Sequence, residues 1–235
     1  MMAGRTETMQ QPAVRVDFDE YAERYEGLLT DQLSFFNKDR GYFSRSKVEL
    51  LARLLPSAPK SILDFGAGIG LTLPYFAEFF PDADLCATDI SEKSLDSVRQ
   101  RFPTVTALAD SAIDARRFDL IFLSGVVHHI PPAERAGVMR RLAGLLTVGG
   151  TLCIFEHNPY NPVTRRMVST CEFDEDAVLI TSSALQALMV EGTGLSIRSK
   201  GYYLFFPEPL KALRPLEAYL ARLPLGGQHY ALASR

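Results

Sequence analysis

The sequence contains no tryptophan, only three cysteines, and no long run of apolar residues. A helix that crosses a membrane needs about 20 predominantly apolar residues, and the longest uncharged stretches, near residues 120–133 and 142–155, are shorter. These stretches are too short to cross a membrane, so we expect no stable membrane insertion.

The cysteines (Cys86, Cys153 and Cys171) are odd in number and widely spaced, which fits neither a disulfide framework nor a cysteine zinc site.

An excess of charge of one sign is also missing, because 25 lysines and arginines stand against 28 acidic residues, for a net charge of −3. Binding to nucleic acid by counterion release needs clustered basic residues, and the chain has no long basic run, so no nucleic-acid partner is expected. The first 16 residues are polar and contain no apolar core of a secretory signal. The composition predicts a cytoplasmic, globular protein.

What the sequence does have is an alternation of short apolar and longer amphipathic segments over most of its 235 residues. Apolar runs that end at glycine or polar residues predict strands buried on both faces, at residues 61–65, 84–88, 105–108, 118–123 and 151–155. Helical periodicity predicts helices at residues 71–80, 92–102 and 133–146, the last one ended by Gly149 and Gly150. Such an alternation is typical of a doubly wound, parallel α/β sheet.

The two ends of the chain depart from this alternation. Residues 1–16 are expected to be a flexible tail, and residues 17–60 an N-terminal helical lid with helices near 17–29 and 43–55. Residues 61–235 are expected to form one domain with insertions at about 157–181 and 207–226. A helix at 183–191 and strands at 196–206 and 229–233 complete the prediction.

Carboxylates gather at the predicted strand ends, where parallel sheets bind ligands. Asp64 ends the first strand, Asp89 follows the second, Asp110 the third and Glu156 the fifth. Each of them alone could be a turn residue or a helix cap. Acids at four of the five strand ends together indicate a binding site.

The segment Asp64-Phe-Gly-Ala-Gly-Ile-Gly70 is the most informative of these ends. Glycines let the backbone approach a ligand closely, at the positive end of the following helix. Position 71 is leucine, so the dinucleotide fingerprint is incomplete, and no Gly-Lys-Ser/Thr of a phosphate-binding loop follows. Together with Asp89, the segment predicts a nucleoside site in which Asp89 binds the ribose hydroxyls and Asp110 reaches the adenine amine.

Five successive stretches carry a family resemblance: ILDFGAGIG, ATDIS, ALADSA, FDLIFLSGVVHHI and LLTVGGTLCIFEH. They resemble the motifs of class I S-adenosylmethionine-dependent methyltransferases, and most closely the branch that includes the ubiquinone/menaquinone C-methyltransferase-like enzymes. The chain has Thr147-Val148 where this family often has Lys-Pro. The resemblance implies a Rossmann-like, mostly parallel seven-stranded sheet with an antiparallel C-terminal strand. It also implies S-adenosylmethionine as cofactor and S-adenosylhomocysteine as product.

The resemblance assigns a part of this cofactor to each matching position. Asp64 would order the glycine turn and contact the amino group, Asp89 would bind the ribose, and Ile90 would pack on the adenine. The remaining positions implied to contact the cofactor are Gly66, Gly68 and Gly70 along the methionine, Asp110 and Ser111 at the adenine edge, and Ser124 near the methionine.

Methyl transfer from a sulfonium needs a base only where the acceptor carries a proton. The predicted catalytic residues are Glu156, His157 and His128, although a histidine of the VVHHIPP stretch could equally be a hydrogen-bonded packing group. No third ligand has a suitable spacing from these histidines, so no metal is expected.

The expected acceptor is a small, apolar or aromatic metabolite, methylated on O, C or N. Its contacts are assigned to residues outside the common motifs, namely Tyr21, Tyr25, His129, Tyr202 and Tyr203. The apolar stripe near residues 202–225 could instead be core or a dimer face, and the chain is expected to be a monomer or homodimer. Two other functions stay open: an NAD-dependent oxidoreductase and a non-catalytic S-adenosylmethionine-binding module.

Overall fold

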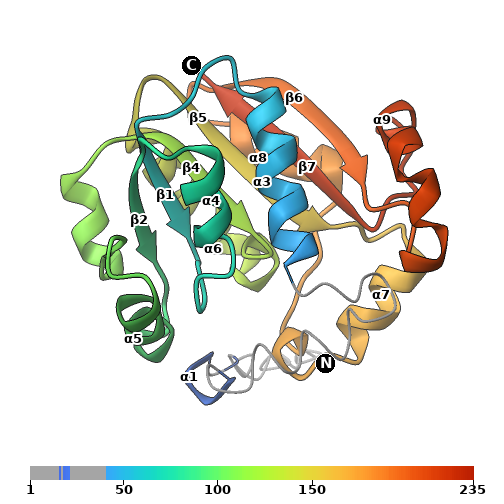
Figure 1. The fold of residues 1–235 in the computed structure, drawn as a ribbon, viewed down its shortest axis with the longest axis horizontal. Helices are drawn as coiled ribbons and strands as arrows, with labels where there is room; N and C mark the ends of the chain where they lie inside the picture. The colour runs from blue at the N-terminus through green and yellow to red at the C-terminus, as the bar shows by residue number, and fades with distance from the viewer. Residues whose placement is uncertain (1–15, 17, 22–40) are drawn as a thin grey trace, which may run out of the picture.

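The computed structural model describes Val16, residues 18–21 and residues 41–235, and this part of the chain forms a seven-stranded sheet with helices on both faces (Figure 1). The strand order is β3-β2-β1-β4-β5-β7-β6. The strands are β1 (Ser61–Phe65), β2 (Asp84–Thr88), β3 (Thr106–Ala107), β4 (Phe118–Ser124), β5 (Leu146–His157), β6 (Ser196–Tyr203) and β7 (Gln228–Ser234).

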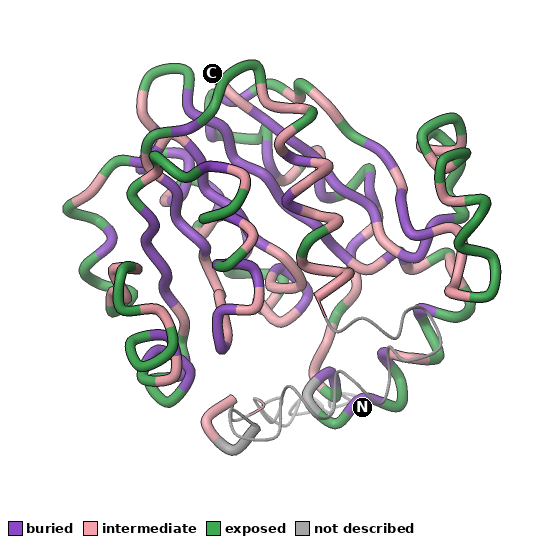
Figure 2. The backbone as a smooth tube through the Cα atoms, in the orientation of Figure 1, coloured by how far each residue is buried: buried purple, intermediate pink, exposed green. Residues whose placement is uncertain are grey.

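The pairing confirms the predicted Rossmann-like fold. Strands β1 to β5 pair in parallel, whereas β7 is antiparallel to both of its neighbours, β5 and β6. In β4 the four residues 120–123 are fully buried, which is why this strand is a continuous apolar run and shows no alternation. Figure 2 shows the buried strands at the centre of the molecule and the exposed residues on the outer surface of the helices.

Two hydrophobic cores lie on opposite faces of the sheet. Leu120 and Phe122 of β4 pack toward α3 (Tyr42–Leu54), α4 (Leu73–Phe79) and α5 (Glu92–Arg101). Ile121 and Leu123 point to the other face, toward α6 (Pro132–Gly144) and α8 (Ser182–Val190). The alternation follows from strand geometry, in which successive side chains leave on opposite sides.

One predicted helix boundary is wrong. Helix α6 ends at Gly144, and Leu146 already pairs with Phe118 at the start of β5. Gly149 lies within β5 with φ +79°, beside a shift of register between β4 and β5. Buried leucines at 145 and 146 fit a helical stripe as well as a strand, so periodicity alone assigned them to the helix.

The predicted strand at residues 196–206 is also too long. Strand β6 ends at Tyr203, because Leu204 adopts a left-handed backbone with φ +61°, which no continuous strand permits.

The insertions have structure of their own. The first, at 157–181, contains α7 (Pro162–Ser169) and the 3₁₀ helix η3 (Glu172–Asp174). The second, at 207–226, contains the 3₁₀ helix η4 (Glu208–Leu216) and α9 (Glu217–Leu220), neither with a buried residue. None of the helices in the described ranges is long and apolar enough to cross a membrane.

Only part of the predicted tail and lid falls within the described residues. Helix α1 (Phe18–Tyr21) lies beyond the carboxyl ends of the strands (Figure 1). Helix α3 packs in the core, with Val48 and Leu51 fully buried. Residues 1–15 of the tail and residues 17 and 22–40 of the lid lie outside the described residues.

Candidate functional site

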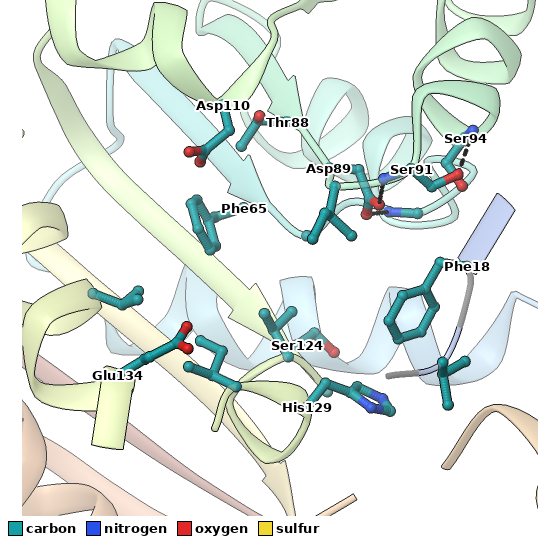
Figure 3. Close-up of a pocket in the computed structure, with 18 of the residues that line it drawn as sticks. Phe18, Phe65, Thr88, Asp89, Ser91, Ser94, Asp110, Ser124, His129 and Glu134 are labelled. Carbon is teal, nitrogen blue, oxygen red and sulfur yellow. Dashed lines mark hydrogen bonds between the residues drawn. The ribbon is translucent and has the colours of Figure 1, made fainter. Parts of the chain in front are cut away.

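The carboxyl ends of β1, β2 and β4 open into a cleft of about 690 Å³ (Figure 3). The strand order reverses between β1 and β4, which is the place where open α/β sheets bind ligands. Its wall comes from the turns after these strands and from α1, α5, α6 and the 3₁₀ helices η1 (Asp110–Ala115) and η2 (Val127–His129). The predicted site residues on this wall are Gly66, Gly68, Asp89, Ile90, Asp110, Ser124 and His129.

The glycine turn between β1 and α4 depends on a left-handed backbone, with φ +73° at Gly66 and +53° at Gly68. A Cβ on Gly66 would lie 2.5 Å from Cγ2 of Val126, so a larger residue does not fit. Asp89 accepts a 2.7 Å hydrogen bond from the Gly68 amide and one of 2.9 Å from the Ser91 amide. Its carboxylate therefore ties the glycine turn to the start of α5.

Asp64 lies beside this turn but does not line the cleft. It is 2% exposed, and Thr72 donates a hydrogen bond from Oγ1 to its Oδ2. Burial raises the pKa of Asp64 to about 7, and the neighbouring carboxylate of Asp89 acts in the same direction. Asp64 is therefore placed to hold the turn from within the protein.

Lys47 is a residue that the sequence analysis did not identify. It lies on α3, and its Nζ donates a 2.6 Å hydrogen bond to Oγ of Ser124 at the end of β4. Burial lowers the pKa of Lys47 to about 8, while the carboxylates of Glu156 and Asp64 oppose that change. An isolated lysine within an amphipathic helix gives no sequence signal of such a position.

Residues predicted at the adenine edge differ in placement. Ile90 is 80% exposed and borders the cleft. Asp110 forms a bidentate ion pair with Arg141 of α6, with Nη1–O distances of 2.8 and 2.9 Å. Ser111 is exposed and does not line the cleft. The carboxylate of Asp110 therefore already has a cationic partner.

Helix α1 closes one side of the cleft (Figure 3). Asp19 accepts a 2.5 Å hydrogen bond from Oγ of Ser91, the residue that caps α5. The ring of Phe18 meets His129 edge-on, with centroids 5.1 Å apart. The amide of Val16 donates to Oδ2 of Asp176 at 3.2 Å. These contacts join α1 to both walls.

Glu156 is fully buried behind the cleft wall and has three hydrogen-bond partners. Its Oε1 accepts hydrogen bonds from the amides of Val126 (3.1 Å) and Val127 (2.7 Å), and its Oε2 lies 2.6 Å from Nδ1 of His128. Burial alone would raise the pKa of Glu156, but the charge and hydrogen bond of His128 lower it to about 2. Glu156 thereby fixes the turn after β4.

The histidines form one cluster with the first insertion. The ring centroid of His128 lies 4.1 Å from that of His129 and 5.1 Å from that of His157. Asp174 of η3 lies 3.4 Å from Nε2 of His128 and 3.3 Å from Nε2 of His129. Burial, with the positive charge of His128, lowers the pKa of His157 to about 4, so His157 is neutral at physiological pH.

Of the tyrosines predicted to contact the acceptor, Tyr202 and Tyr203 do not line the described cleft. Tyr203 is buried against Phe155, with centroids 5.3 Å apart, and donates a hydrogen bond to Oε1 of Gln228. Tyr202 packs near His229, with centroids 6.0 Å apart. Tyr25 and the side chain of Tyr21 lie outside the described residues.

Besides Lys47, the sequence analysis missed the acids of α1 and of the first insertion. Asp19, Asp174 and Asp176 carry no motif, and each lies far along the chain from its partner. The sequence signal that could have indicated Asp174 and Asp176 was the acidic segment CEFDED at residues 171–176, which follows the two neighbouring histidines.

Comparison with known proteins gives a consistent result. Residues 63–152 match a family model described as a methyltransferase domain. The chain is 39% identical over 114 residues to a trans-aconitate 2-methyltransferase of Methylobacterium radiotolerans, an alignment that covers 47% of this chain and 43% of the relative. It is 32% identical over 98 residues to the methyltransferase str2 of Strobilurus tenacellus, covering 41% and 35%. The chain thus spans less than half the length of these curated relatives.

Solved structures share the fold. A SAM-dependent methyltransferase of Archaeoglobus fulgidus superimposes with a TM-score of 0.67 at 14% identity, covering 90% of this chain and all of that one. A plantazolicin methyltransferase in complex with a substrate analogue and SAH gives a TM-score of 0.61 at 17% identity, covering 93% and 99%. Because trans-aconitate methyltransferases are among the named relatives, the narrower resemblance to quinone C-methyltransferases is not confirmed.

Proposed function

We propose that the chain carries a class I S-adenosylmethionine-dependent methyltransferase domain and that it transfers a methyl group from S-adenosylmethionine to a small molecule. One observation carries this proposal. The carboxylate of Asp89 lies at the end of β2, bonded to the glycine turn and beside the exposed Ile90, on the wall of a 690 Å³ cleft. This is the arrangement that a bound nucleoside requires.

The residues present fit the cofactor. We propose that Oδ1 and Oδ2 of Asp89, which each accept one backbone amide, also accept the ribose hydroxyls. The glycine turn leaves backbone without side chains on the cleft wall. Oγ1 of Thr88, also on this wall, is buried and has no hydrogen-bond partner among the described residues. A polar ligand would supply one. When bound, the cofactor provides a methyl group on a positively charged sulfur.

Charge on the cleft wall favours a neutral or cationic acceptor. Its carboxylates are Asp19, Asp89, Asp110, Glu134 and Asp176. Arg141 also lines it, but the guanidinium of Arg141 is paired with Asp110 and Asp114. Several of the curated relatives are named for trans-aconitate, a carboxylate. We propose that this chain instead takes an apolar or aromatic acceptor, because carboxylates repel one another in a partly buried site.

The predicted catalytic roles of Glu156, His157 and His128 stay predictions. Glu156 and His128 are buried behind the wall, so we propose that Glu156 positions the turn after β4 and does not touch the acceptor. His157 has a pKa lowered to about 4 and does not line the cleft, and its Nδ1 lies 3.5 Å from Nε2 of Gln228. The cytoplasmic location and the monomeric or homodimeric state also remain predictions.

The test is a calorimetric titration with S-adenosylmethionine, S-adenosylhomocysteine and NAD. We expect binding of the first two. Asp89→Asn removes one ribose acceptor and should weaken both by about 10-fold or more, since an unpaired hydroxyl costs about 1–3 kcal/mol. The matched control is Asp82→Asn, which changes an exposed carboxylate outside the cleft and should bind like the wild type.

Turnover is followed as S-adenosylhomocysteine formed with a panel of phenols, aromatic amines and trans-aconitate. Faster turnover with trans-aconitate than with every neutral acceptor would overturn the proposed acceptor class. Binding of NAD alone would support the oxidoreductase alternative. Cofactor binding without turnover across the panel would favour a non-catalytic module.

A further inference from the structure

Two histidines and one aspartate at the edge of the cleft lie close to one common point. They are His128 and His129 of η2 and Asp174 of η3, and one ligand atom from each lies within 4.8 Å of the other two. Oδ1 of Asp174 is 3.4 Å from Nε2 of His128 and 3.3 Å from Nε2 of His129. Three donors bonded to one zinc at 2.0–2.1 Å in tetrahedral geometry are about 3.4 Å apart. Both measured edges match that separation.

A carboxylate holds the opposite nitrogen of each histidine. Nδ1 of His128 lies 2.6 Å from Oε2 of Glu156, and Nδ1 of His129 lies 3.2 Å from Oδ1 of Asp176. Metal-bound histidines have this arrangement, in which a carboxylate on one ring nitrogen fixes the tautomer and directs the lone pair of the other. Here both Nε2 atoms are directed at Asp174.

The buried histidine makes no hydrogen bond to a described residue at the point where the metal would lie, although Oδ1 of Asp174 is 3.4 Å away. The side chain of His128 is 1% exposed, and its Nε2 makes no hydrogen bond within the described part of the chain. Buried polar atoms are rarely left unpaired, and such an atom calls for an unseen ligand.

We propose that His128 Nε2, His129 Nε2 and the carboxylate of Asp174 bind one divalent transition-metal ion, of which Zn²⁺ is the representative. Two imidazoles and one carboxylate suit zinc and its neighbours better than magnesium or calcium, which prefer oxygen ligands alone. The ion would fasten the first insertion to the turn after β4, whether or not methyl transfer is the function.

Sequence spacing could not reveal this site. The two histidines are adjacent, and their third partner belongs to an insertion whose course no motif predicts. Only the packing of η3 against η2 brings Asp174 to them.

The test is a zinc titration of the full chain after removal of metals with a chelator, using a competing chromophoric indicator. We expect one zinc per chain. Asp176→Asn should weaken binding about 10- to 100-fold, as changes to the carboxylate behind a ligand do, and Asp174→Asn should weaken it further. The matched control Glu172→Gln, an exposed acid on the same short helix, should leave affinity unchanged.

Imidazole ¹⁵N spectra of the wild type keep the test decisive even where a variant fails to fold. The competing state is a protonated His128 held between two carboxylates. Zinc should shift the Nε2 resonances of two histidines and leave them without a bound hydrogen. A persistent Nε2–H signal on His128 at saturating zinc, the absence of saturable binding, or equal binding by Asp174→Asn would overturn the site.

Discussion

Two buried carboxyl groups near the cleft have pKa values that are shifted in opposite directions, and the number of their hydrogen-bond donors explains why. Glu156 receives two amide hydrogen bonds and faces His128, so its pKa is lowered to about 2 despite complete burial. The hydrogen bond from Thr72 to Asp64 is not enough to offset its burial, and its pKa is raised to about 7. Hydrogen bonds and opposite charge thus decide whether a buried acid stays ionised.

This difference predicts how stability depends on pH through Asp64. The folded state keeps its proton up to about pH 7, whereas the unfolded state releases it near 3.8, so this group destabilises the fold as pH rises between those values. The side chain of Asp64→Asn cannot ionise, so the variant does not lose stability in this way. From about pH 5 to pH 8, the free energy of unfolding of the variant should rise relative to the wild type by about 2–3 kcal/mol.

Urea unfolding of both proteins at the two pH values measures the effect. Asp82→Asn, an exposed acid, serves as the control and should follow the wild type. Parallel pH profiles for Asp64→Asn and the wild type would mean that Asp64 is ionised throughout.

At the scale of elements, substitution of glycine by alanine should destabilise the fold at one position and stabilise it at another. Gly70 has φ +80°, and a Cβ there would lie 2.7 Å from Cδ1 of Leu73 and 2.8 Å from Cε2 of Phe102. Gly70→Ala should destabilise the fold by more than about 1 kcal/mol. Gly137 is within α6 with open space around its Cβ, so Gly137→Ala should stabilise by about 0.5–1 kcal/mol. Thermal unfolding followed by circular dichroism measures both changes in stability. If both variants were stabilised, or both destabilised, this explanation would be wrong.

Element type was predictable from the apolar pattern, whereas boundaries were predictable only where a glycine or a polar residue ends the apolar run. Strands β1 and β2 have the predicted bounds, because each is a short apolar run ended by a glycine or polar turn. The boundary between α6 and β5 was misplaced because leucines at 145 and 146 are buried in either state. The left-handed Leu204 gave no signal, since leucine rarely adopts that conformation.

At the scale of the whole molecule, protection against hydrogen exchange should be uneven. The amides of β4 and β5 belong to central strands between two cores, whereas η4 and α9 contain no buried residue. We expect amides of residues 208–220 to exchange faster than those of residues 120–123, when followed by mass spectrometry. If residues 208–220 were as strongly protected as residues 120–123, this would indicate that another chain covers them. The alternative interpretation of this segment as a dimer face predicts that result.

The candidate site was predictable only where it follows the sheet. Gly66, Gly68 and Asp89 were found because strand ends meet at one edge, a property of the topology. Lys47, Asp19 and Asp174 reach the same region through packing of helices and an insertion, and no local pattern records such packing. For that reason both histidines of the cluster were predicted as site residues, whereas Asp174 was not.

The strand order β5-β7-β6 has a consequence for how the protein is made. β7 is synthesised after β6 and yet lies between β5 and β6, so on the ribosome β6 emerges with no neighbour to pair with. Until residues 228–234 have been translated, β5 presents an open edge of unpaired amides and carbonyls, the kind of edge that recruits foreign strands. The nascent chain is therefore most exposed to misassembly, and most dependent on chaperones, in the interval before β7 leaves the exit tunnel.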